Sequence, residues 1–255
     1  MIGDSVIQKG FLLAVAIAAA STGVLRSPAP PVPVVVELFT SEGCSSCPPA
    51  DRLLIELVKT QPVKDALIIG LSEHVDYWNQ LGWKDPFSDH LFSQRQSQYA
   101  AAAGTTDIYT PQMVVDGHES FVGSDRAAAM AAIARAAATP KAPIVLGWTT
   151  TNPRKLTVQM TGGAPAAGAV VIAAVLEDGL SVSVRRGENS GQTLEHSAVT
   201  RRLVEIGRAD RMGTFTHAGV RLDLDPGWRI SNLRFVVLAY SEGRHQVLAA
   251  ATVTP

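Results

Sequence analysis

The chain has 255 residues, a formal net charge of −1, and 46% hydrophobic against 18% charged residues. This length and composition predict one or two packed domains and exclude a largely disordered chain. No long basic block is present, so a nucleic-acid partner is not expected. The sequence contains two cysteines, Cys44 and Cys47, whereas a disulfide scaffold carries more cysteines at wider spacing.

The first 33 residues are typical of an export signal or an N-terminal anchor, followed by a proline-rich linker. Lys9 precedes an apolar run from Phe11 to Ala20, and small residues and the prolines of 28–33 come next. A positive start, a short apolar core and small residues near its end are features of secretory signals. The run is shorter than the ~20 residues that a membrane-spanning helix needs. We therefore expect a periplasmic or secreted protein, with a tether to the inner membrane as the alternative.

Residues 34–140 alternate between strand-like and helix-like patterns. Runs of β-branched residues predict strands, and apolar residues at three- and four-residue spacing predict helices. Their order, β-α-β-α-β-β-α, predicts an α/β domain with a mixed central sheet. Ser88 and Ser124 are the expected helix caps. The predicted elements are strands at Val34–Phe39 and Ala66–Leu71, a hairpin of Gln112–Val115 with Ser120–Val122, and helices at Asp51–Thr60, from Ser88 to about Ala103 and from Ser124 to about Ala138.

Two prolines in the segment 138–143 predict a linker, so residues 141–255 are expected to form a second domain. Short strand-like runs separated by Gly, Pro, Asn and Asp predict an all-β, sandwich-like domain. The polar segment Arg185–Gly191 is expected to be a solvated loop, although such loops can bind partners. The candidate strands are Ile144–Thr150, Lys155–Met160, Ala169–Leu176, Leu180–Val184, Arg201–Ile206, Val220–Leu224, Leu233–Tyr240 and Val247–Val253.

The strongest chemical signal is the pair Cys44 and Cys47 between the first strand and the first helix. Two cysteines at this spacing can close a disulfide within one turn, and a helix N-terminus stabilises a thiolate. Cys44 would then be the attacking sulfur, and Cys47 would release the mixed disulfide. Pro48 and Pro49 follow directly, so the helix can instead begin at Cys47 or Pro48, which weakens the dipole's effect on Cys44.

A second signal is Thr110-Pro111, immediately before a predicted strand. Proline in a sheet belongs at a strand's first residue or at a special turn. In a thioredoxin-like fold this proline is cis and faces the cysteine pair, which leaves neighbouring backbone groups such as Thr110 free to pair with a substrate. An ordinary trans proline that starts an edge strand is the alternative.

The chain resembles the exported bacterial family called domain of unknown function 1223, and residues 33–138 resemble a thioredoxin-like domain. The resemblance lies in the strings VVELFTSEGCSSCPPAD, EHVDYW, LGWKDPFS, QRQSQYA, YTPQMVVDG and RRGENSGQTLEHSAVTRRL. It implies that Cys44 and Cys47 are a redox pair and that Pro111 is the cis-proline. The family name conveys a fold and no settled activity.

Three further residues are candidates near the pair. Glu37, on the first strand, could accept the proton of Cys47 or simply face water at the strand end. His74, at the end of the second strand, could tune the thiolate, bind substrate or complete a metal site, or be a hydrogen-bonded structural residue. Trp78 is expected in a loop that covers the site or packs on it.

The sequence therefore predicts a thiol–disulfide oxidoreductase that needs no cofactor. Its expected partners are exported proteins with thiols or disulfides, or a redox partner protein. One alternative is a copper(I) carrier that uses Cys44, Cys47 and His74, because soft thiolates select such ions. Another is a non-catalytic binding module whose disulfide is structural. A redox role requires that an incoming thiol can reach one of the two sulfurs.

Overall fold

The structure is a computed structural model that describes residues 30–149, 155–160, 167–222 and 224–255. Within it, Pro31–Pro255 forms one compact unit. The predicted export signal or anchor lies almost entirely outside the described residues. In the part of the chain that is described, no helix combines the length and the apolar character needed to cross a membrane.

The first half of the unit follows the predicted order of elements. Two helix caps differ from the prediction by one residue. The carboxylate of Asp89 accepts the Leu91 N–H and that of Asp125 accepts the Ala128 N–H, because an Asp side chain satisfies a free amide of the first turn. The elements are β1 (Val32–Thr40), α1 (Pro48–Thr60), β2 (Ala66–His74), α2 (His90–Ala102), β3 (Gln112–Val115), β4 (Glu119–Val122) and α3 (Arg126–Ala137).

The second half consists of strands, as predicted, with two differences. Strand β9 was not predicted, and β11 begins five residues before the predicted run at Val220. The strands are β5 (Ile144–Thr149), β6 (Lys155–Met160), β7 (Val170–Glu177), β8 (Leu180–Ser183), β9 (Thr193–His196), β10 (Val199–Arg208), β11 (Phe215–Arg221), β12 (Leu233–Tyr240) and β13 (Val247–Val253).

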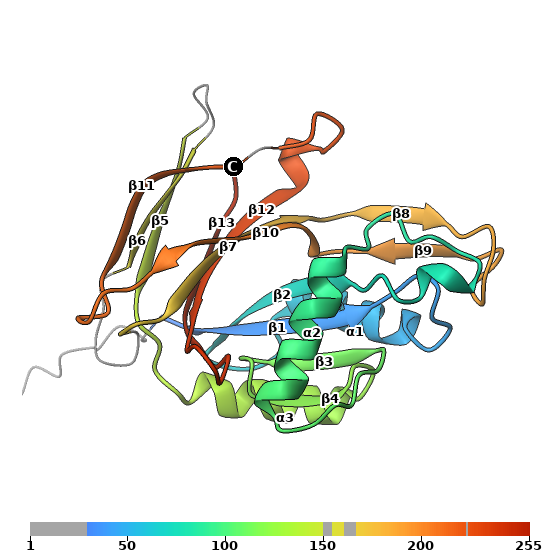
Figure 1. Cartoon of the computed structure of the whole chain (residues 1–255), viewed down its shortest axis with the longest axis horizontal. Coiled ribbons are helices and arrows are strands. Elements are labelled where there is room, and N and C mark those ends of the chain that lie inside the picture. Colours follow the sequence, from blue (N-terminus) through green and yellow to red (C-terminus); the bar gives the residue numbers. More distant parts are fainter. Residues whose placement is uncertain (1–29, 150–154, 161–166, 223) are drawn as a thin grey trace, which may run out of the picture. The chain divides into compact units, whose positions relative to one another are not determined.

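A mixed sheet of eight strands within the described residues forms the centre, in the order β13-β12-β7-β10-β2-β1-β3-β4 (Figure 1). Strands β1 and β2 are parallel, and β3 runs antiparallel to β1. Strand β10 pairs with β2 in parallel at Val199 and Ser72. This single pair, beside the hydrogen bond from the Ser72 N–H to the Ala198 carbonyl at 2.7 Å, joins β2 to the strands of the second half. The two segments predicted as separate domains therefore share one sheet and one compact unit.

Helices cover the two faces of the β1–β4 region. Side chains alternate between faces along a strand, so Val34, Val36 and Leu38 pack with α1 and α3. Phe39 faces the opposite side and packs against Tyr99 of α2. The face that a β1 residue occupies decides which helix it can contact.

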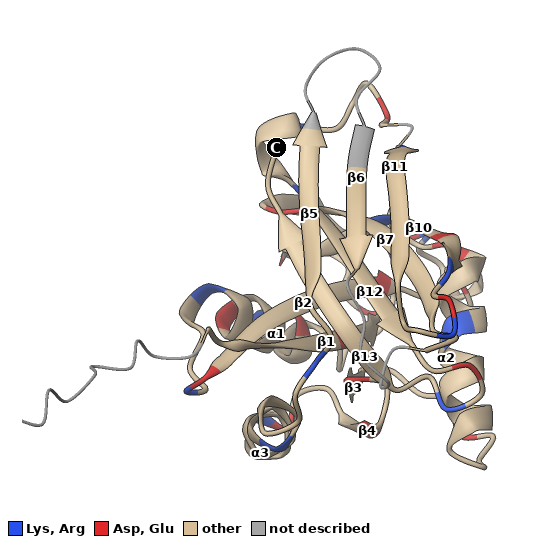
Figure 2. Cartoon of the chain, turned by 90° about the vertical axis from the view of Figure 1, so that its left-hand side faces the viewer, with Lys and Arg blue, Asp and Glu red and all other residues tan. Residues whose placement is uncertain are grey.

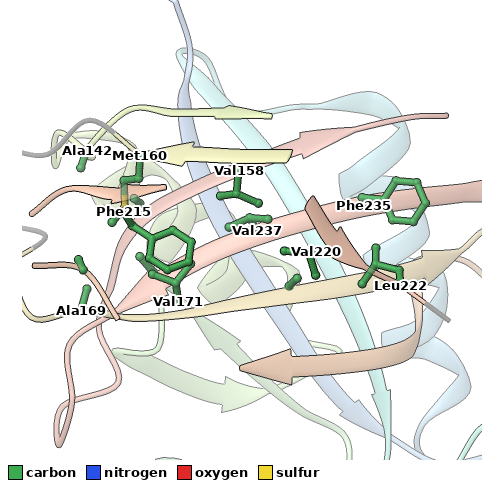
Figure 3. Close-up of a cluster of buried hydrophobic side chains, with 14 of the residues drawn as sticks. Ala142, Val158, Met160, Ala169, Val171, Phe215, Val220, Leu222, Phe235 and Val237 are labelled. Carbon is green, nitrogen blue, oxygen red and sulfur yellow. The ribbon is translucent and has the colours of Figure 1, made fainter. Parts of the chain in front are cut away.

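A smaller sheet of β11, β6 and β5 packs against β7 and β12 of the central sheet. Its strands carry almost no charged residues (Figure 2). Met160 and Val158 of β6 and Phe215 of β11 pack with Val171 of β7 and Val237 of β12 in one buried apolar cluster (Figure 3). This cluster packs the three-stranded sheet against strands of the central sheet.

Strands β8 and β9 form a hairpin of their own, with Leu180 opposite His196. Among the described residues, neither strand joins the central sheet or the three-stranded one. The hairpin extends past the end of the central sheet, beside the loops that follow β1 and β2 (Figure 1).

Candidate functional site

Cys44 and Cys47 form a disulfide with their Cα atoms 5.4 Å apart, in the turn between β1 and α1. Cys47 is the N-cap of α1, and its carbonyl oxygen accepts the N–H groups of Ala50 at 2.9 Å and Asp51 at 3.1 Å. Pro48 occupies the first helical position, where the lack of an N–H costs no hydrogen bond. The helix thus begins after Cys47, and Cys44 lies one turn outside it.

Three of the predicted residues lie around this turn. The Thr110–Pro111 peptide bond is cis. A Cβ atom at Gly123 would lie 3.1 Å from Cβ of both Pro111 and Ala50, so the proline ring is close to the first turn of α1. Trp78 Nε1 donates to Thr110 Oγ1 at 2.8 Å.

Trp78 also packs on the cysteine turn. A Cβ atom at Gly43 would lie 3.3 Å from Trp78 Cβ. The absence of a side chain at Gly43 therefore lets the tryptophan backbone lie close to the residue before Cys44. Trp78 thus connects the cysteine turn to Thr110.

Glu37 lies on the other face of the sheet. Its carboxylate accepts from Arg95 Nε at 2.6 Å, Arg95 Nη2 at 3.0 Å and the Tyr99 hydroxyl at 2.6 Å, all from α2. Odd-numbered residues of β1 face α2, whereas Leu38 and Thr40 face α1. Glu37 therefore neither faces water nor lies beneath the cysteine pair.

Glu73 completes this buried cluster on the α2 face. Its Oε1 lies 3.6 Å from Arg95 Nε, and neither carboxyl oxygen has a hydrogen-bond partner. Burial raises the pKa of Glu73 well above its usual value, the Glu37 charge adds to this, and Arg95 opposes it. Burial and the neighbouring Glu37 charge therefore favour the neutral form of Glu73.

The buried carboxyl on the side of the cysteines is Asp51, which is 6% exposed. It lies four residues after Cys47, one helical turn further along α1. Thr40 Oγ1 donates to Asp51 Oδ1 at 2.8 Å. Burial raises the pKa of Asp51, whereas the nearby His196 and His74 and the Thr40 hydroxyl lower it less strongly.

His74 is buried at the end of β2 and pairs with Asp85. Its Nδ1 lies 2.7 Å from Asp85 Oδ2, which also accepts the N–H of Glu42 at 2.8 Å. Burial disfavours the imidazolium, but Asp85, together with Asp51 and Glu42, outweighs this effect and raises the pKa of His74. His74, together with hydrogen bonds from the backbone N–H groups of Glu42 and Phe87, outweighs burial at Asp85 and lowers the pKa of that carboxyl.

A second histidine, from β9, lies beside the first. The ring centroids of His74 and His196 are 4.9 Å apart. His196 Nε2 lies 3.1 Å from Glu42 Oε1, and Trp83 Nε1 donates to Glu42 Oε2 at 2.7 Å. His74 Nε2 and His196 Nδ1 are buried without a hydrogen-bond partner. The cysteine turn thus borders a buried network of acids and imidazoles.

Residues 184–192, which we call the covering loop, lie on the cysteine turn. Asn189 Nδ2 donates to the carbonyl oxygens of Glu42 and Cys44, each at 2.9 Å. Glu188 Oε2 accepts the Ser45 N–H at 2.9 Å. Cys44 and Cys47 are both 0% exposed. In this conformation an incoming thiol cannot reach either sulfur.

The predicted copper site gains no further support. Within the described ranges, no group of three or more His, Cys, Asp and Glu side chains is arranged to hold a metal ion. His74 has its Nδ1 committed to Asp85, and its Nε2 faces the buried network.

Sequence reasoning missed five site residues. Asp51 could have been found from its position one helical turn after Cys47. Asn189 and His196 lie in RRGENSGQTLEHSAVTRRL, but nothing in that string indicates which surface it contacts. Glu42 and Asp85 carried no pattern, because the backbone brings them together only in the folded chain.

Comparisons with known proteins agree on the fold and name no activity. The chain resembles a crystal structure of protein AGR_C_4864 from Agrobacterium tumefaciens with 25% identity and a TM-score of 0.67, covering 89% of this chain and 96% of that one. HBP35 of Porphyromonas gingivalis is similar at 16% identity and a TM-score of 0.62, over 89% of this chain and 76% of the other, which shows the fold alone. No curated protein matches. The family model described as "Protein of unknown function (DUF1223)" matches residues 35–239, and the chain therefore belongs to that family.

Proposed function

We propose that this protein is a thiol–disulfide oxidoreductase with a thioredoxin-like arrangement of strands β1–β4 and helices α1–α3. The observation that carries the proposal is the Cys44–Cys47 disulfide at the start of α1, with the cis-proline Pro111 close to the first turn of that helix. A disulfide across one turn at a helix start is a setting in which thiols exchange rather than only cross-link. Thr110, ahead of the proline, supplies backbone groups for an extended substrate.

The exchange proceeds in two displacement steps. A substrate thiolate attacks Cys44 Sγ, the Cys44–Cys47 bond breaks, and Cys47 leaves as a thiolate that takes up a proton. A second substrate thiolate then attacks the substrate sulfur of the mixed disulfide and releases the Cys44 thiolate. The substrate dithiol loses two electrons and two protons, and the protein pair gains the two electrons. The reverse sequence reduces a substrate disulfide.

Asp51 is the proton carrier for Cys47 in this proposal, the role that the sequence offered to Glu37. A carboxyl whose pKa is raised by burial keeps its proton to a higher pH than an exposed carboxyl does, and it can pass that proton to a neighbouring thiolate. Its position one helical turn from Cys47 places it on the same side of α1. When Cys47 attacks a mixed disulfide, Asp51 accepts the proton of the Cys47 thiol.

The substrates that we propose are exported proteins with thiols or disulfides, or a redox partner protein. This rests on the sequence pattern of the first 33 residues, which is typical of an export signal, with a membrane tether as the alternative. Fractionation of cells that produce the full chain tests it. Recovery in the periplasm or medium, or in the inner-membrane fraction for a tether, supports export, and recovery in the cytoplasm contradicts it.

A structural disulfide is the second candidate, and the burial of both cysteines favours it. A disulfide that no thiol can reach stabilises the protein only by restricting the conformations of the unfolded chain. This candidate predicts that reduction waits for global unfolding, whereas the exchange proposal predicts reduction of the folded protein.

Trapping of a mixed disulfide tests the exchange proposal. Reduced Cys47→Ser is mixed with a cysteine peptide activated as its thionitrobenzoate disulfide, and Cys44→Ser serves as the matched control. We expect Cys47→Ser to form a lasting mixed disulfide at least tenfold faster than Cys44→Ser. Equal rates, or labelling only in denaturant, would contradict the proposed roles.

A further inference from the structure

We propose that the covering loop occupies the place of a polypeptide substrate on the cysteine turn and must move aside before exchange. This inference rests on the proposed function. Asn189 and Glu188 would then gate the disulfide, and an extended polypeptide backbone would take their place on the cysteine turn.

The covering loop offers the cysteine turn the same groups that a peptide backbone offers. Asn189 Nδ2 is an amide donor, and it donates to the carbonyl oxygens of Glu42 and Cys44. Glu188 Oε2 is an acceptor for the N–H of Ser45. An extended substrate has amide N–H donors and carbonyl acceptors, and can satisfy the same backbone atoms. These backbone groups would thus keep partners after the loop leaves.

Most of the covering loop is exposed, and its buried residues are Val184 and Asn189. Asn189 is 1% exposed, but residues 185–188 and 190–192 are exposed. The loop connects strands β8 and β9, which pair with each other and with no other strand among the described residues. Segments with little buried apolar area and no sheet neighbour open at low free-energy cost. Opening the covering loop leaves the central sheet intact.

The base of the hairpin, in contrast, is anchored. Asp178 Oδ1 accepts the N–H of Ala198 at 2.7 Å, and the Asp178 carboxylate pairs with Arg234 of β12 at 2.6 Å. Gly179 follows with φ +67°, a conformation that glycine adopts without strain. His196 of β9 is also held, by its contact with Glu42, so movement is confined to the covering loop.

Hydrogen bonds within the covering loop keep its shape. Gly191 N–H donates to the Val184 carbonyl at 2.8 Å, Ser190 N–H to that of Gly187 at 3.2 Å, and Ser190 Oγ to that of Arg185 at 3.0 Å. The loop can thus leave and return as one unit, and the hydrogen bonds of Asn189 and Glu188 to the cysteine turn are the polar contacts that opening breaks.

The experiment measures how fast the Cys44–Cys47 disulfide of the folded full chain is reduced as dithiothreitol is increased. If the covering loop gates the disulfide, the wild-type rate levels off at the rate of loop opening. The same limiting rate is expected with tris(2-carboxyethyl)phosphine, which differs in size and chemistry. Asn189→Ala removes both donated hydrogen bonds, and its limiting rate should rise about tenfold, the factor that corresponds to about 1.4 kcal/mol.

Glu195→Ala, at an exposed position of β9, is the matched control and should stay within twofold of the wild type. Glu188→Ala is a second variant and should act in the same direction as Asn189→Ala, so the test does not depend on one protein folding well. Global unfolding rates of each variant, from chevron plots, are measured in parallel.

The outcomes separate the gate from the proposed function. Fast reduction that is linear in reductant and equal in the wild type and Asn189→Ala overturns the gate and leaves exchange intact. Reduction of both proteins only at the global unfolding rate overturns the exchange proposal itself. A limiting rate faster than unfolding, raised in Asn189→Ala, supports the gate.

Discussion

Asn189 donates a hydrogen bond to the carbonyl oxygen of Cys44, a residue 145 positions earlier in the chain. This contact joins the second half of the protein to the cysteine turn. It also gives a physical role to the polar segment Arg185–Gly191, for which the sequence favoured a solvated loop. The segment is exposed along most of its length, but its one buried side chain is bonded to the candidate redox site.

Asp51→Asn is expected to slow resolution of the mixed disulfide by Cys47 by about 10²-fold, because a positioned proton carrier contributes a factor of that order. The measurement is the rate of peptide-thiol release from a mixed disulfide preformed at Cys44, followed from pH 5 to 9. The wild-type rate should depend on the ionisation of Asp51, and this dependence should be lost in the variant. An unchanged rate and pH profile would remove Asp51 from the mechanism.

The same substitution should not lower stability at neutral pH. The pKa of Asp51 is raised in the folded state, so its ionised form costs stability as the pH rises above the unfolded value near 3.9. Asparagine removes that charge and keeps an oxygen for the Thr40 hydroxyl. Urea unfolding at pH 7 should give a midpoint equal to or above that of the wild type, and the difference should vanish below about pH 4.

Glu37→Gln is the converse variant, because Glu37 lies on the α2 face. It weakens charged hydrogen bonds to Arg95 and Tyr99, which should lower the free energy of unfolding by about 1–3 kcal/mol. Thiol exchange at a temperature where the variant is folded should stay within twofold of the wild type. A large loss of exchange rate with normal stability would mean that Glu37 acts on Cys47 after all.

Asp85→Asn should destabilise the fold by about 3 kcal/mol, since it leaves His74 buried without its charged partner. Asp85 has a lowered pKa, so its contribution is present above pH 3.9 and is lost as the pH falls through the folded-state value. His74 has a raised pKa, so its contribution is present below about pH 6.5 and is lost as the pH rises through the folded-state value.

The difference in unfolding free energy between the wild type and Asp85→Asn should therefore be largest from about pH 4 to 6.5. Urea titrations across pH 3 to 9 measure it. A difference in unfolding free energy that stays constant from pH 3 to 9 would contradict an ion pair between His74 and Asp85.

Gly123→Ala tests the packing around Pro111. A Cβ atom at this position would lie 2.7 Å from Leu38 Cδ1 and 3.1 Å from Cβ of both Ala50 and Pro111. Overpacking of this kind is expected to cost about 1–3 kcal/mol and to displace Pro111 from the start of α1. Calorimetry gives the stability. Gly104→Ala, at a glycine with open space around it, controls for the added methyl group, although its φ of +71° adds a backbone cost.

Local patterns in the sequence predicted most of the elements and their order. The β-branched run at Val34–Phe39 and the hairpin around Gly117 are examples, because strand periodicity and turn residues act over a few positions. The mixed central sheet agrees with the prediction for the first segment. Strand β9 was missed because Thr193–His196 is short and polar.

Sheet pairing between distant segments could not be predicted. Val199 pairs with Ser72 across more than a hundred residues, and hydrophobic periodicity gives the face of a strand but not its neighbour. Glu37 shows the same limit, because a shift of one residue along β1 decides whether a side chain faces α1 or α2. The acid–imidazole network of Glu42, His74, Asp85 and His196 depends on such pairings.

The central claim is that Cys44 and Cys47 exchange with other thiols, and their reduction potential tests it most directly. The full chain is equilibrated with glutathione buffers, and the oxidised fraction is determined by thiol alkylation and mass spectrometry. We predict a potential between about −120 and −270 mV, the range of exchange-active pairs. A potential below about −300 mV, typical of structural disulfides, would contradict the account.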